Sequence, residues 1–481
     1  MTLVEPIPLV DLAPVRRAHF IAIGGAGMSP IAQLWHQRGI DVDGCDQADS
    51  QTAARLRADG IPVTIGHQVD HLTGVDTVVV SSAIRDDNPE LLAAKAANLR
   101  VWHRSAALAA VMAGSLGVAI SGTHGKSTTS AMVAAGLSFV DPSYVLGATL
   151  VETGSSSHQG RPGGVFVIEA DESDGSYLQY EPQVVVLTNV EADHLDRWGT
   201  PQAYAAGFES FVGGPTVRQV VLNADDSVCQ AMAKRLQSAG RPVVTYGQSE
   251  DAMVRLGDCR VNRLSSTADL TWSDGQAQLA IGLPGRHNLQ NAAAAFATAV
   301  AVSRLGQDID LGQVIKGLAS YRGIQRRFQL VGQIRGIDIV DDYAHHPTEI
   351  SAAIATARLV AGQRRLVVCF QPHLFTRTRD FANQFGQALA KADIVVVCDV
   401  YPAREDPLPG VTGELVAKAA RQNGAEVIYA PTLTQAVDVL ASLVDSEKVG
   451  AADLIMTVGA GDVTTVGYDL LARFQGCETN A

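Results

Sequence analysis

The residues with the clearest chemical pattern lie between positions 118 and 129. An apolar run of strand type, residues 118–121, leads into the sequence Gly122-Thr123-His124-Gly125-Lys126-Ser127-Thr128. Glycines let backbone N–H groups converge on phosphate oxygens, the lysine adds a mobile positive charge, and the serine hydroxyl can join a magnesium shell. The common pattern has another glycine where Ile120 stands, so this loop is a shorter variant. It predicts a nucleotide phosphate site, and the alternative is a purely structural strand-to-helix turn.

Two later strands end in side chains that suit magnesium. The apolar run 165–169 ends at Glu169, and the run 184–190 is followed by acids and His194. Parallel strands bring their carboxyl ends to one edge of a sheet, so we expect Glu169 and His194 beside the Lys126 loop. A single acid in a loop is more often only solvated. The prediction therefore depends on three strand ends occurring together.

A second glycine-rich turn lies near the start of the chain. Residues 18–23 are typical of a buried strand, Gly25-Ala26-Gly27-Met28 turn into a helix, and a further strand ends at Asp46. This order predicts a Rossmann-like unit, with a diphosphate at the helix N-terminus and a ribose hydroxyl on the acid. Pro30 stands at the third glycine position, so NAD and the diphosphate of a different nucleotide both stay open.

Ser81 and Ser82 lie at the C-terminal end of another predicted strand, residues 78–84. Ligands of open α/β sheets bind at that edge, which makes both serines candidates for ligand contact. The alternative is a capping role in a turn or helix.

Polar residues also mark the second half of the chain. Asn288 and Asn291 open a predicted alanine-rich helix and share one face of its first turn, although asparagine is also ordinary at a helix N-cap. Arg326 and Arg327 lie in a predicted linker. Either they only keep that linker charged, or one arginine reaches across a domain gap to a γ-phosphate.

The last third of the chain repeats the alternation of strands and helices, which predicts a second Rossmann-like sheet. The ends of its predicted strands carry side chains that could hold a carboxylate, namely Tyr343, His345, His373, Arg377 and Arg404. The adjacent His345 and His346 could bind zinc, but no supporting Cys/His cluster follows them in the sequence.

Length and composition indicate the fold class and the domains that must position these residues. The 481 residues exceed one ordinary core, and we predict an α/β protein of three domains. These are a Rossmann-like domain (1–113), a central P-loop ATPase-like domain with a mostly parallel sheet (114–328), and a Rossmann-like C-terminal domain (329–481). The net charge of -13 argues against a nucleic-acid partner. Six scattered cysteines without CxxC spacing favour reduced thiols in a cytoplasmic protein, and no apolar run is long enough for a membrane span.

Six motifs occur in an order that resembles the Mur ligases of peptidoglycan precursor synthesis. They are residues 122–129, 169–173, 188–196, 287–291, 326–328 and 341–347. Together with the glycine turn at 24–28, they carry the resemblance over nearly the whole chain. The set is far more specific than any one of its members.

The resemblance implies three domains that bind the UDP part of a substrate, ATP and an amino acid. It implies that ATP and Mg²⁺ are used to join L-alanine to the carboxylate of UDP-N-acetylmuramate through an acyl phosphate, with release of ADP and phosphate. It further implies a cytoplasmic monomer or homodimer with no nucleic-acid or membrane partner.

The same resemblance assigns roles to residues. Lys126, His194, Arg327 and Asp342 would be catalytic, with Arg327 and Asp342 entering the site on domain closure. ATP would contact Gly122, Thr123, His124, Gly125, Lys126, Ser127, Thr128, Asn288, Asn291 and Arg327. Magnesium would be held by Ser127, Glu169 and His194. The UDP substrate would contact Gly25, Ala26, Gly27, Met28, Asp46, Ser81, Ser82 and His124. Alanine or the muramyl group would be held by Tyr343, His345, His373, Arg377 and Arg404.

Two departures from the family pattern stand out. Ser127 replaces the usual threonine and keeps its hydroxyl. Related ligases for later amino acids place a carbamylated lysine between two magnesium ions, but no lysine lies between His194 and Lys234, so we expect magnesium held without one.

Three other functions would use parts of the same sequence pattern. The nearest is a ligase that re-attaches a recycled murein tripeptide to UDP-N-acetylmuramate, against which residues 81–84 favour the alanine enzyme. An NAD-dependent oxidoreductase would leave the Lys126 loop unexplained. A catalytically silent ATP-binding regulator would be expected to lose the lysine or a metal ligand, and none is lost.

Overall fold

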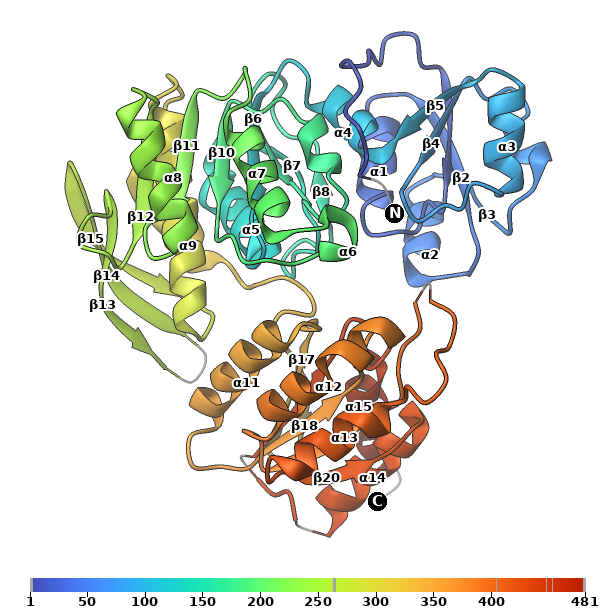
Figure 1. Cartoon of the computed structure of the whole chain (residues 1–481), viewed down its shortest axis with the longest axis vertical. Helices are drawn as coiled ribbons and strands as arrows, with labels where there is room; N and C mark the ends of the chain where they lie inside the picture. The colour runs from blue at the N-terminus through green and yellow to red at the C-terminus, as the bar shows by residue number, and fades with distance from the viewer. Residues whose placement is uncertain (1–2, 263–264, 404, 447, 452, 479–481) are drawn as a thin grey trace. The chain divides into compact units, whose positions relative to one another are not determined.

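The computed structural model describes residues 3–262, 265–403, 405–446, 448–451 and 453–478, which form three β-sheets flanked by helices (Figure 1). The chain divides into two compact units. The first contains Met1–Arg260, Thr267–Gly282 and Arg286–Arg322, and it holds the N-terminal and central sheets. The second contains Gly323–Ala481 with the short pieces Val261–Ser266 and Leu283–Gly285, and it holds the third sheet.

The N-terminal sheet has the strand order β3-β2-β1-β4-β5 and is parallel throughout. Its strands are β1 (Arg17–Ile21), β2 (Asp41–Asp46), β3 (Val63–Ile65), β4 (Thr77–Val80) and β5 (Arg100–His103). Its helices are α1 (Ser29–Gln37), α2 (Gln51–Ala58), η1 (Val69–Leu72), α3 (Pro89–Ala96) and α4 (Arg104–Met112). The strand order reverses between β1 and β4. The glycine turn after β1 and the serines after β4 therefore lie at the switch point where Rossmann-like sheets bind ligands.

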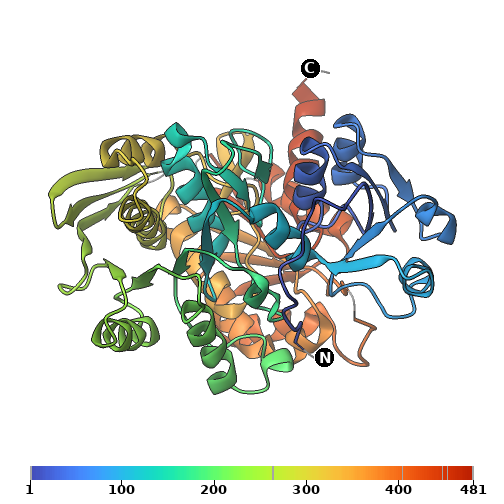
Figure 2. The ribbon, with the colours of Figure 1, turned by 90° about the horizontal axis from the view of Figure 1, so that it is seen from above.

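The central sheet has ten strands in the order β15-β14-β13-β12-β11-β10-β6-β9-β7-β8. Its strands are β6 (Leu116–Ser121), β7 (Ser143–Val145), β8 (Ser157–His158), β9 (Val165–Glu169), β10 (Val184–Leu187), β11 (Gln219–Asn223), β12 (Val243–Gly247), β13 (Val254–Val261), β14 (Ser266–Trp272) and β15 (Gly275–Ile281). The ladder from β7 to β13 is parallel, as predicted for this sheet. The two-residue connection between β14 and β15 makes that pair antiparallel, and these yellow-green strands extend one end of the sheet (Figures 1 and 2).

Helices and short turns complete the central region. They are α5 (Lys126–Gly136), η2 (Ser138–Val140), η3 (Ser176–Gln179), α6 (Leu195–Trp198), α7 (Pro201–Val212), α8 (Ser227–Ser238), α9 (Arg286–Ser303) and α10 (Leu311–Ser320). The α9 helix buries most of its alanines against α5, β11 and β12. Because alanine is small, α5 and α9 can approach closely, and this contact brings Asn291 to the Lys126 loop.

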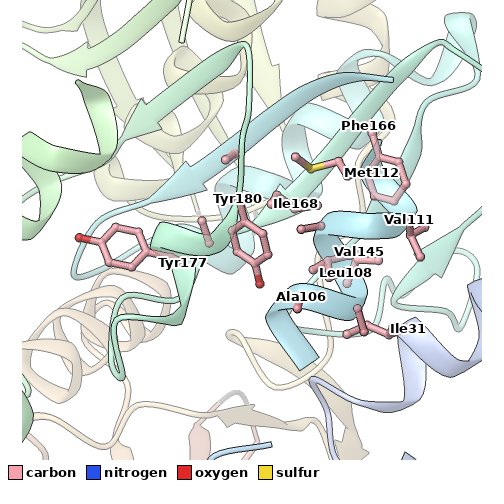
Figure 3. Packing of buried hydrophobic residues seen from close by; sticks show 14 of the residues in the cluster. Ile31, Ala106, Leu108, Val111, Met112, Val145, Phe166, Ile168, Tyr177 and Tyr180 are labelled. Carbon is pink, nitrogen blue, oxygen red and sulfur yellow. The ribbon is translucent and has the colours of Figure 1, made fainter. Parts of the chain in front are cut away.

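One apolar core joins the first two sheets. Leu108, Val111 and Met112 of α4 lie between Ile31 of α1 and the β9 side chains Phe166 and Ile168 (Figure 3). All of these residues are nearly fully buried. The two sheets share a single core cluster, which agrees with their grouping into one compact unit.

The third sheet has the order β16-β17-β21-β18-β19-β20, with β16 antiparallel and the other strands parallel. Its strands are β16 (Gln329–Ile334), β17 (Ile337–Asp342), β18 (Leu366–Phe370), β19 (Ile394–Val397), β20 (Glu426–Tyr429) and β21 (Leu454–Val458). Its helices are α11 (Pro347–Ala361), α12 (Phe375–Leu389), α13 (Gly413–Gln422), α14 (Leu433–Asp445) and α15 (Thr464–Glu478). Separate apolar clusters pack the two faces, which is the layering of a Rossmann-like sheet.

The structure confirms the predicted α/β class with three sheet-based parts. β4 ends at Val80 and β10 at Leu187, earlier than the predicted strands, and Ser82 and Thr188, which follow them, make side-chain contacts with neighbouring loops. Within the described residues, no helix combines the length and apolar character needed to cross a bilayer.

Candidate active site

The loop between β6 and α5 is shaped by two glycines with left-handed backbone. Gly122 has a φ of 125°, and a Cβ there would overlap the hydroxyl of Thr188. Gly125 has a φ of 83°, and a Cβ there would lie 2.8 Å from Oδ1 of Asn291. Only glycine fits both constraints, so the loop can wrap closely around an anion at the start of α5.

Lys126 folds back over this loop. Its Nζ donates to the backbone oxygens of Gly122 (2.7 Å) and Thr123 (3.0 Å), and it lies 2.9 Å from Oε2 of Glu172. Burial would lower the pKa of Lys126, but the carboxylates of Glu172 and Asp171 outweigh burial and raise it. The lysine is therefore charged and ready to exchange these oxygens for those of a phosphate.

Glu172 was not singled out from the sequence. It is fully buried, and burial raises its pKa to about 7, although Lys126 opposes the rise. Its Oε1 also accepts from the hydroxyl of Tyr204 at 3.2 Å. The sequence shows a run of acids at residues 169–174 but cannot tell which of them faces the lysine.

Ser127 and Glu169 come together as predicted. The Ser127 hydroxyl donates to Oε1 of Glu169 at 3.1 Å, and Oε2 of Glu169 accepts from the backbone N–H of Gly147 at 2.9 Å. Burial raises the pKa of Glu169, whereas Lys126 lowers it. A hydroxyl and a carboxylate at the first turn of α5 form an oxygen pair of the kind that Mg²⁺ binds beside a phosphate.

The segment after β10 is fixed to the phosphate loop. The backbone N–H of His124 donates to Oδ1 of Asn189 at 2.9 Å, and the Thr188 hydroxyl donates to the His124 oxygen at 2.6 Å. The His124 ring lies 3.1 Å from Oε2 of Glu191. His194 follows in a left-handed conformation at the N-cap of α6, with φ of 52°. The segment that leads to His194 is thus anchored at the loop through Thr188, Asn189 and Glu191.

The two asparagines of α9 also reach this region. Oδ1 of Asn291 accepts from the Thr129 hydroxyl at 3.2 Å, and its amide group donates to Oδ1 of Asn288 at 3.4 Å. Both asparagines are buried. The pair therefore faces α5 rather than serving as a simple helix cap.

The N-terminal residues predicted to bind a UDP group lie in and around the turn between β1 and α1. Gly25, Ala26 and Gly27 form the turn between β1 and α1, whereas the side chain of Met28 is buried in the core. Asp46 accepts the backbone N–H of Gly24 at 2.9 Å and that of Gln47 at 2.8 Å. Asp46 thus helps to fix the glycine turn, a contact that the sequence did not reveal.

Ser82 connects the two sheets of the first unit. Its hydroxyl donates to Asp174 and lies 3.1 Å from Nε2 of His103, whose pKa falls to about 4 because of burial and the nearby Arg104. Ser81 precedes it in the turn after β4. A polar path therefore runs from the glycine-turn sheet to the acids beside Lys126.

Arg104 is a cation that the sequence did not identify. It begins α4, lies 3.5 Å from Asp171 and 4.0 Å from Asp174, and borders the position where a Cβ on Gly27 would stand. Burial would lower the pKa of Arg104, but Tyr180 and these carboxylates hold it above its ordinary value. The position puts a permanent positive charge between the glycine turn and the phosphate loop.

In the second unit, Arg327, Asp342 and Tyr343 gather at the end of β17. Asp342 accepts the backbone N–H groups of Phe328 (2.8 Å) and Ala344 (2.9 Å), and burial raises its pKa to about 6 against the effect of Arg327. The guanidinium of Arg327 lies 5.7 Å from the centre of the Tyr343 ring. Asp342 thus fixes the linker that carries Arg327.

Three of the residues predicted to hold an amino acid form a ring cluster. The ring of His345 lies 5.5 Å from that of Tyr343 and 5.9 Å from that of His373, and burial lowers the pKa of His345 to about 4. Arg377, on α12, contributes a smaller lowering effect. His373 stacks on Tyr401 at 5.7 Å, while His346 packs on Phe381 instead. Arg404 lies outside the described residues.

Comparison with known proteins follows the same division of the chain. Residues 17–115 match the Mur ligase family catalytic domain, residues 120–299 the Mur ligase middle domain, and residues 326–461 the Mur ligase glutamate ligase domain. All three regions carry sites described above.

Relatives that align along nearly the whole chain indicate the same family. The chain is 52% identical over 480 residues to UDP-N-acetylmuramate–L-alanine ligase of Cutibacterium acnes, covering 99% of this chain and 100% of the relative. It is 50% identical to the Kineococcus radiotolerans enzyme of that name, with 96% of each chain covered. A crystal structure of UDP-N-acetylmuramate–alanine ligase from Thermotoga maritima matches with a TM-score of 0.80 at 29% identity, over 96% of this chain and 99% of that one. The chain belongs to the Mur ligase family.

Proposed function

We propose that this protein joins L-alanine to the carboxylate of UDP-N-acetylmuramate, converting ATP to ADP and phosphate. The observation that carries this proposal is the glycine cradle around Lys126, flanked by Ser127 and Glu169. The choice of substrates rests on the relatives named UDP-N-acetylmuramate–L-alanine ligase, which are 43–52% identical along nearly the whole chain. We assign the reaction to the cytoplasm, as part of peptidoglycan precursor synthesis.

The first chemical step brings two anions together. A carboxylate oxygen of the muramyl group attacks the γ-phosphorus, the bond to the β-phosphate oxygen breaks, and an acyl phosphate forms. Lys126 offsets the repulsion at the phosphates, because its ammonium is held among carboxylates and backbone oxygens that a phosphate can replace. The backbone N–H groups at the start of α5 orient the phosphates.

The residues present fit a magnesium ion. Ser127 and Glu169 would hold it, and His194, on the segment anchored to the loop, is the proposed ligand of a second ion. Bound Mg²⁺ supplies charge neutralisation at the phosphate oxygens. Glu169 must be ionised for this role, and Lys126 favours that form by lowering the pKa that burial raises.

The UDP group is assigned to the switch point of the N-terminal sheet. The turn of Gly25, Ala26 and Gly27 offers backbone N–H groups to a diphosphate, and Ser81 and Ser82 border the same crevice. Arg104 is placed to hold the substrate's negative charge between this crevice and Lys126.

The second step needs a neutral amine. L-Alanine attacks the carbonyl carbon of the acyl phosphate, and phosphate leaves with one oxygen of the original carboxylate. We assign the amino acid to the cluster of Tyr343, His345 and His373. Because the pKa of His345 is about 4, its ring is neutral near pH 7 and can accept a hydrogen bond from the amine.

Phosphate release distinguishes the candidate reactions. With ATP, Mg²⁺ and UDP-N-acetylmuramate present, we expect phosphate release that depends on L-alanine. Glycine and L-serine, tested as competing amines, should be weaker substrates, and murein tripeptide should be inactive. Release that depends on the tripeptide and not on alanine would instead indicate the recycling ligase. If neither L-alanine nor the tripeptide stimulates phosphate release, the proposed function is wrong.

A further inference from the structure

A second group of chemically reactive side chains lies in the N-terminal sheet. His19 comes from β1, Cys45 from β2, His71 from η1 and Glu90 from α3. One ligand atom from each lies within 4.8 Å of all the others. In the part of the chain that the structure describes, this is the only convergence of three or more His, Cys, Asp or Glu ligand atoms. None of these four residues belongs to the sites proposed above.

The group is buried and its donors face inward. His19 is 1% exposed, and Cys45 and Glu90 are 0% exposed. Nε2 of His19 points into the group yet makes no hydrogen bond, and its nearest ionic partner, Oε1 of Glu90, is 3.5 Å away. A buried ring nitrogen without a hydrogen bond is costly, so this atom points to a ligand.

The other nitrogen of His19 is held as in metal sites. Nδ1 lies 2.6 Å from Oδ1 of Asp43, and Asp43 accepts from Arg17 at 2.9 Å. A carboxylate on one ring nitrogen fixes the tautomer and leaves the other nitrogen as the electron-pair donor. The Asp43 contact therefore prepares Nε2 for coordination.

We propose that His19, Cys45, His71 and Glu90 bind one Zn²⁺ ion. One sulfur, two imidazole nitrogens and one carboxylate suit zinc, whereas Mg²⁺ and Ca²⁺ prefer oxygen alone. Two protein anions, the Cys45 thiolate and the Glu90 carboxylate, neutralise the ion's two charges. Binding releases two protons to solvent, one from the Cys45 thiol and one from Nε2 of His19. In a tetrahedral zinc site, ligand atoms are roughly 3.3–3.8 Å apart, so small movements within the 4.8 Å group are sufficient.

The surroundings fit a structural ion. Cys45 belongs to a small apolar cluster with Ile21, Val78 and Leu91, which shields the group on one side. His67 borders the more open side, with Nδ1 3.1 Å from Sγ of Cys45 and 3.0 Å from Oε2 of Glu90. All four protein ligands would close the coordination shell and tie η1 and α3 to two strands, which is typical of structural rather than catalytic zinc.

The competing explanation is a metal-free ion pair. Burial would lower the pKa of His19, but Asp43, Cys45 and Glu90 together raise it to about 11. A protonated His19 could then offset Glu90, and the Cys45 thiol would donate to Oε2 of Glu90 at 2.9 Å. Zinc and this proton are mutually exclusive on Nε2, so metal content separates the two explanations.

The test uses the full-length protein, stripped with a chelator, dialysed and re-equilibrated with Zn²⁺ or Co²⁺. We expect one zinc ion per chain by elemental analysis, and a thiolate-to-cobalt charge-transfer band in the cobalt form. C45S should lose the band and at least nine-tenths of the bound zinc, and H71Q should bind zinc at least tenfold more weakly. C229S is the matched control, because Cys229 is equally buried in α8 but lies outside the group.

Two outcomes would overturn the proposal. One is a wild-type chain that takes up no zinc at micromolar free metal, which leaves the metal-free ion pair. The other is zinc uptake and a cobalt band that persist unchanged in both C45S and H71Q. If C45S does not fold, as judged by circular dichroism, H71Q and the wild-type cobalt spectrum still decide, since His71 is partly exposed and tolerates exchange better.

Discussion

Two buried polar groups in the first unit differ in how they are built. The Lys126 group lies on loops after β6, β9 and β10, and its glycines let the first loop pack closely against Thr188 and Asn291. The His19 group comes from β1, β2, η1 and α3, and its ligand atoms lie within 4.8 Å of one another. The loop-built group suits a ligand that binds and leaves, and the strand-built group suits a ligand that stays bound.

The electrostatics of the two groups differ in the same sense. Lys126 is a mobile cation held by exchangeable oxygens, so an arriving phosphate can replace them. His19 is fixed by Asp43 on one side and faces a thiol and a carboxylate on the other. The first arrangement favours reversible binding of an anion, and the second favours permanent binding of a cation.

The largest effect is expected from K126A. Removing the ammonium should lower the rate of L-alanine-dependent phosphate release at least about 10²-fold, as for loss of one donor to a reacting anion. Zinc content and UDP-N-acetylmuramate binding, measured by calorimetry, should persist. K234A, which removes an exposed lysine on α8, is the control. A near-normal rate of phosphate release in K126A would contradict the role of the Lys126 group in the reaction.

Zinc removal should act on stability and leave ATP binding alone. Free zinc at about 100 times its Kd adds about 2.7 kcal/mol to the free energy of unfolding. We expect urea unfolding to shift accordingly between stripped and reloaded protein, while the Kd for ATP changes less than twofold. A parallel change in ATP affinity would show that the groups are coupled.

The unfolding free energy of the ligand-free protein should depend on Glu172. Its folded pKa of about 7 lies above the ordinary 4.5, so the folded state holds an extra proton in this window. That contribution is complete below pH 4.5 and is lost as the pH rises to about 7, and its size is on the order of 3 kcal/mol. E172Q should flatten this part of the stability profile. E209Q, at an exposed position of α7, should leave the profile as in wild type, and an unchanged profile in E172Q would contradict the assignment.

A smaller effect separates two glycines. G125A and G240A both place a side chain at positive φ, 83° and 72°, which costs about 1–2 kcal/mol each. Only at Gly125 does the new Cβ meet a neighbour, Oδ1 of Asn291. We therefore expect weaker ATP binding in G125A alone, by fluorescence titration. Equal ATP affinities would mean that the close fit around the loop is unimportant.

The two groups also show what the sequence can reveal. Lys126 and Ser127 could be predicted as site residues because they belong to one contiguous loop of recognisable sequence. Glu169 could be predicted because it ends a strand. Glu172 was missed because an acid run does not show which carboxylate turns towards the lysine. The His19 group was missed because its members are separated by 19 to 26 residues, and only the parallel order of β1 and β2 with the packing of η1 and α3 brings them together.

The fold shows the same limit. Alternating apolar runs and turns predicted three α/β regions, which the structure confirms. The sequence predicts Asp46 as a ligand of a ribose hydroxyl but does not predict that its carboxylate also accepts the Gly24 and Gln47 backbone N–H groups. Such contacts depend on loop geometry, which residue spacing does not encode.

Carboxylate activation at the Lys126 group can be measured as the transfer of an oxygen atom from the carboxylate to phosphate. UDP-N-acetylmuramate labelled with ¹⁸O in its carboxylate is converted with ATP and L-alanine, and the released phosphate is analysed by mass spectrometry. An acyl phosphate passes one carboxylate oxygen to phosphorus, so we predict one ¹⁸O in the phosphate for each labelled carboxylate consumed. Phosphate that contains no ¹⁸O while the alanine product accumulates would show that the carboxylate is not activated as an acyl phosphate.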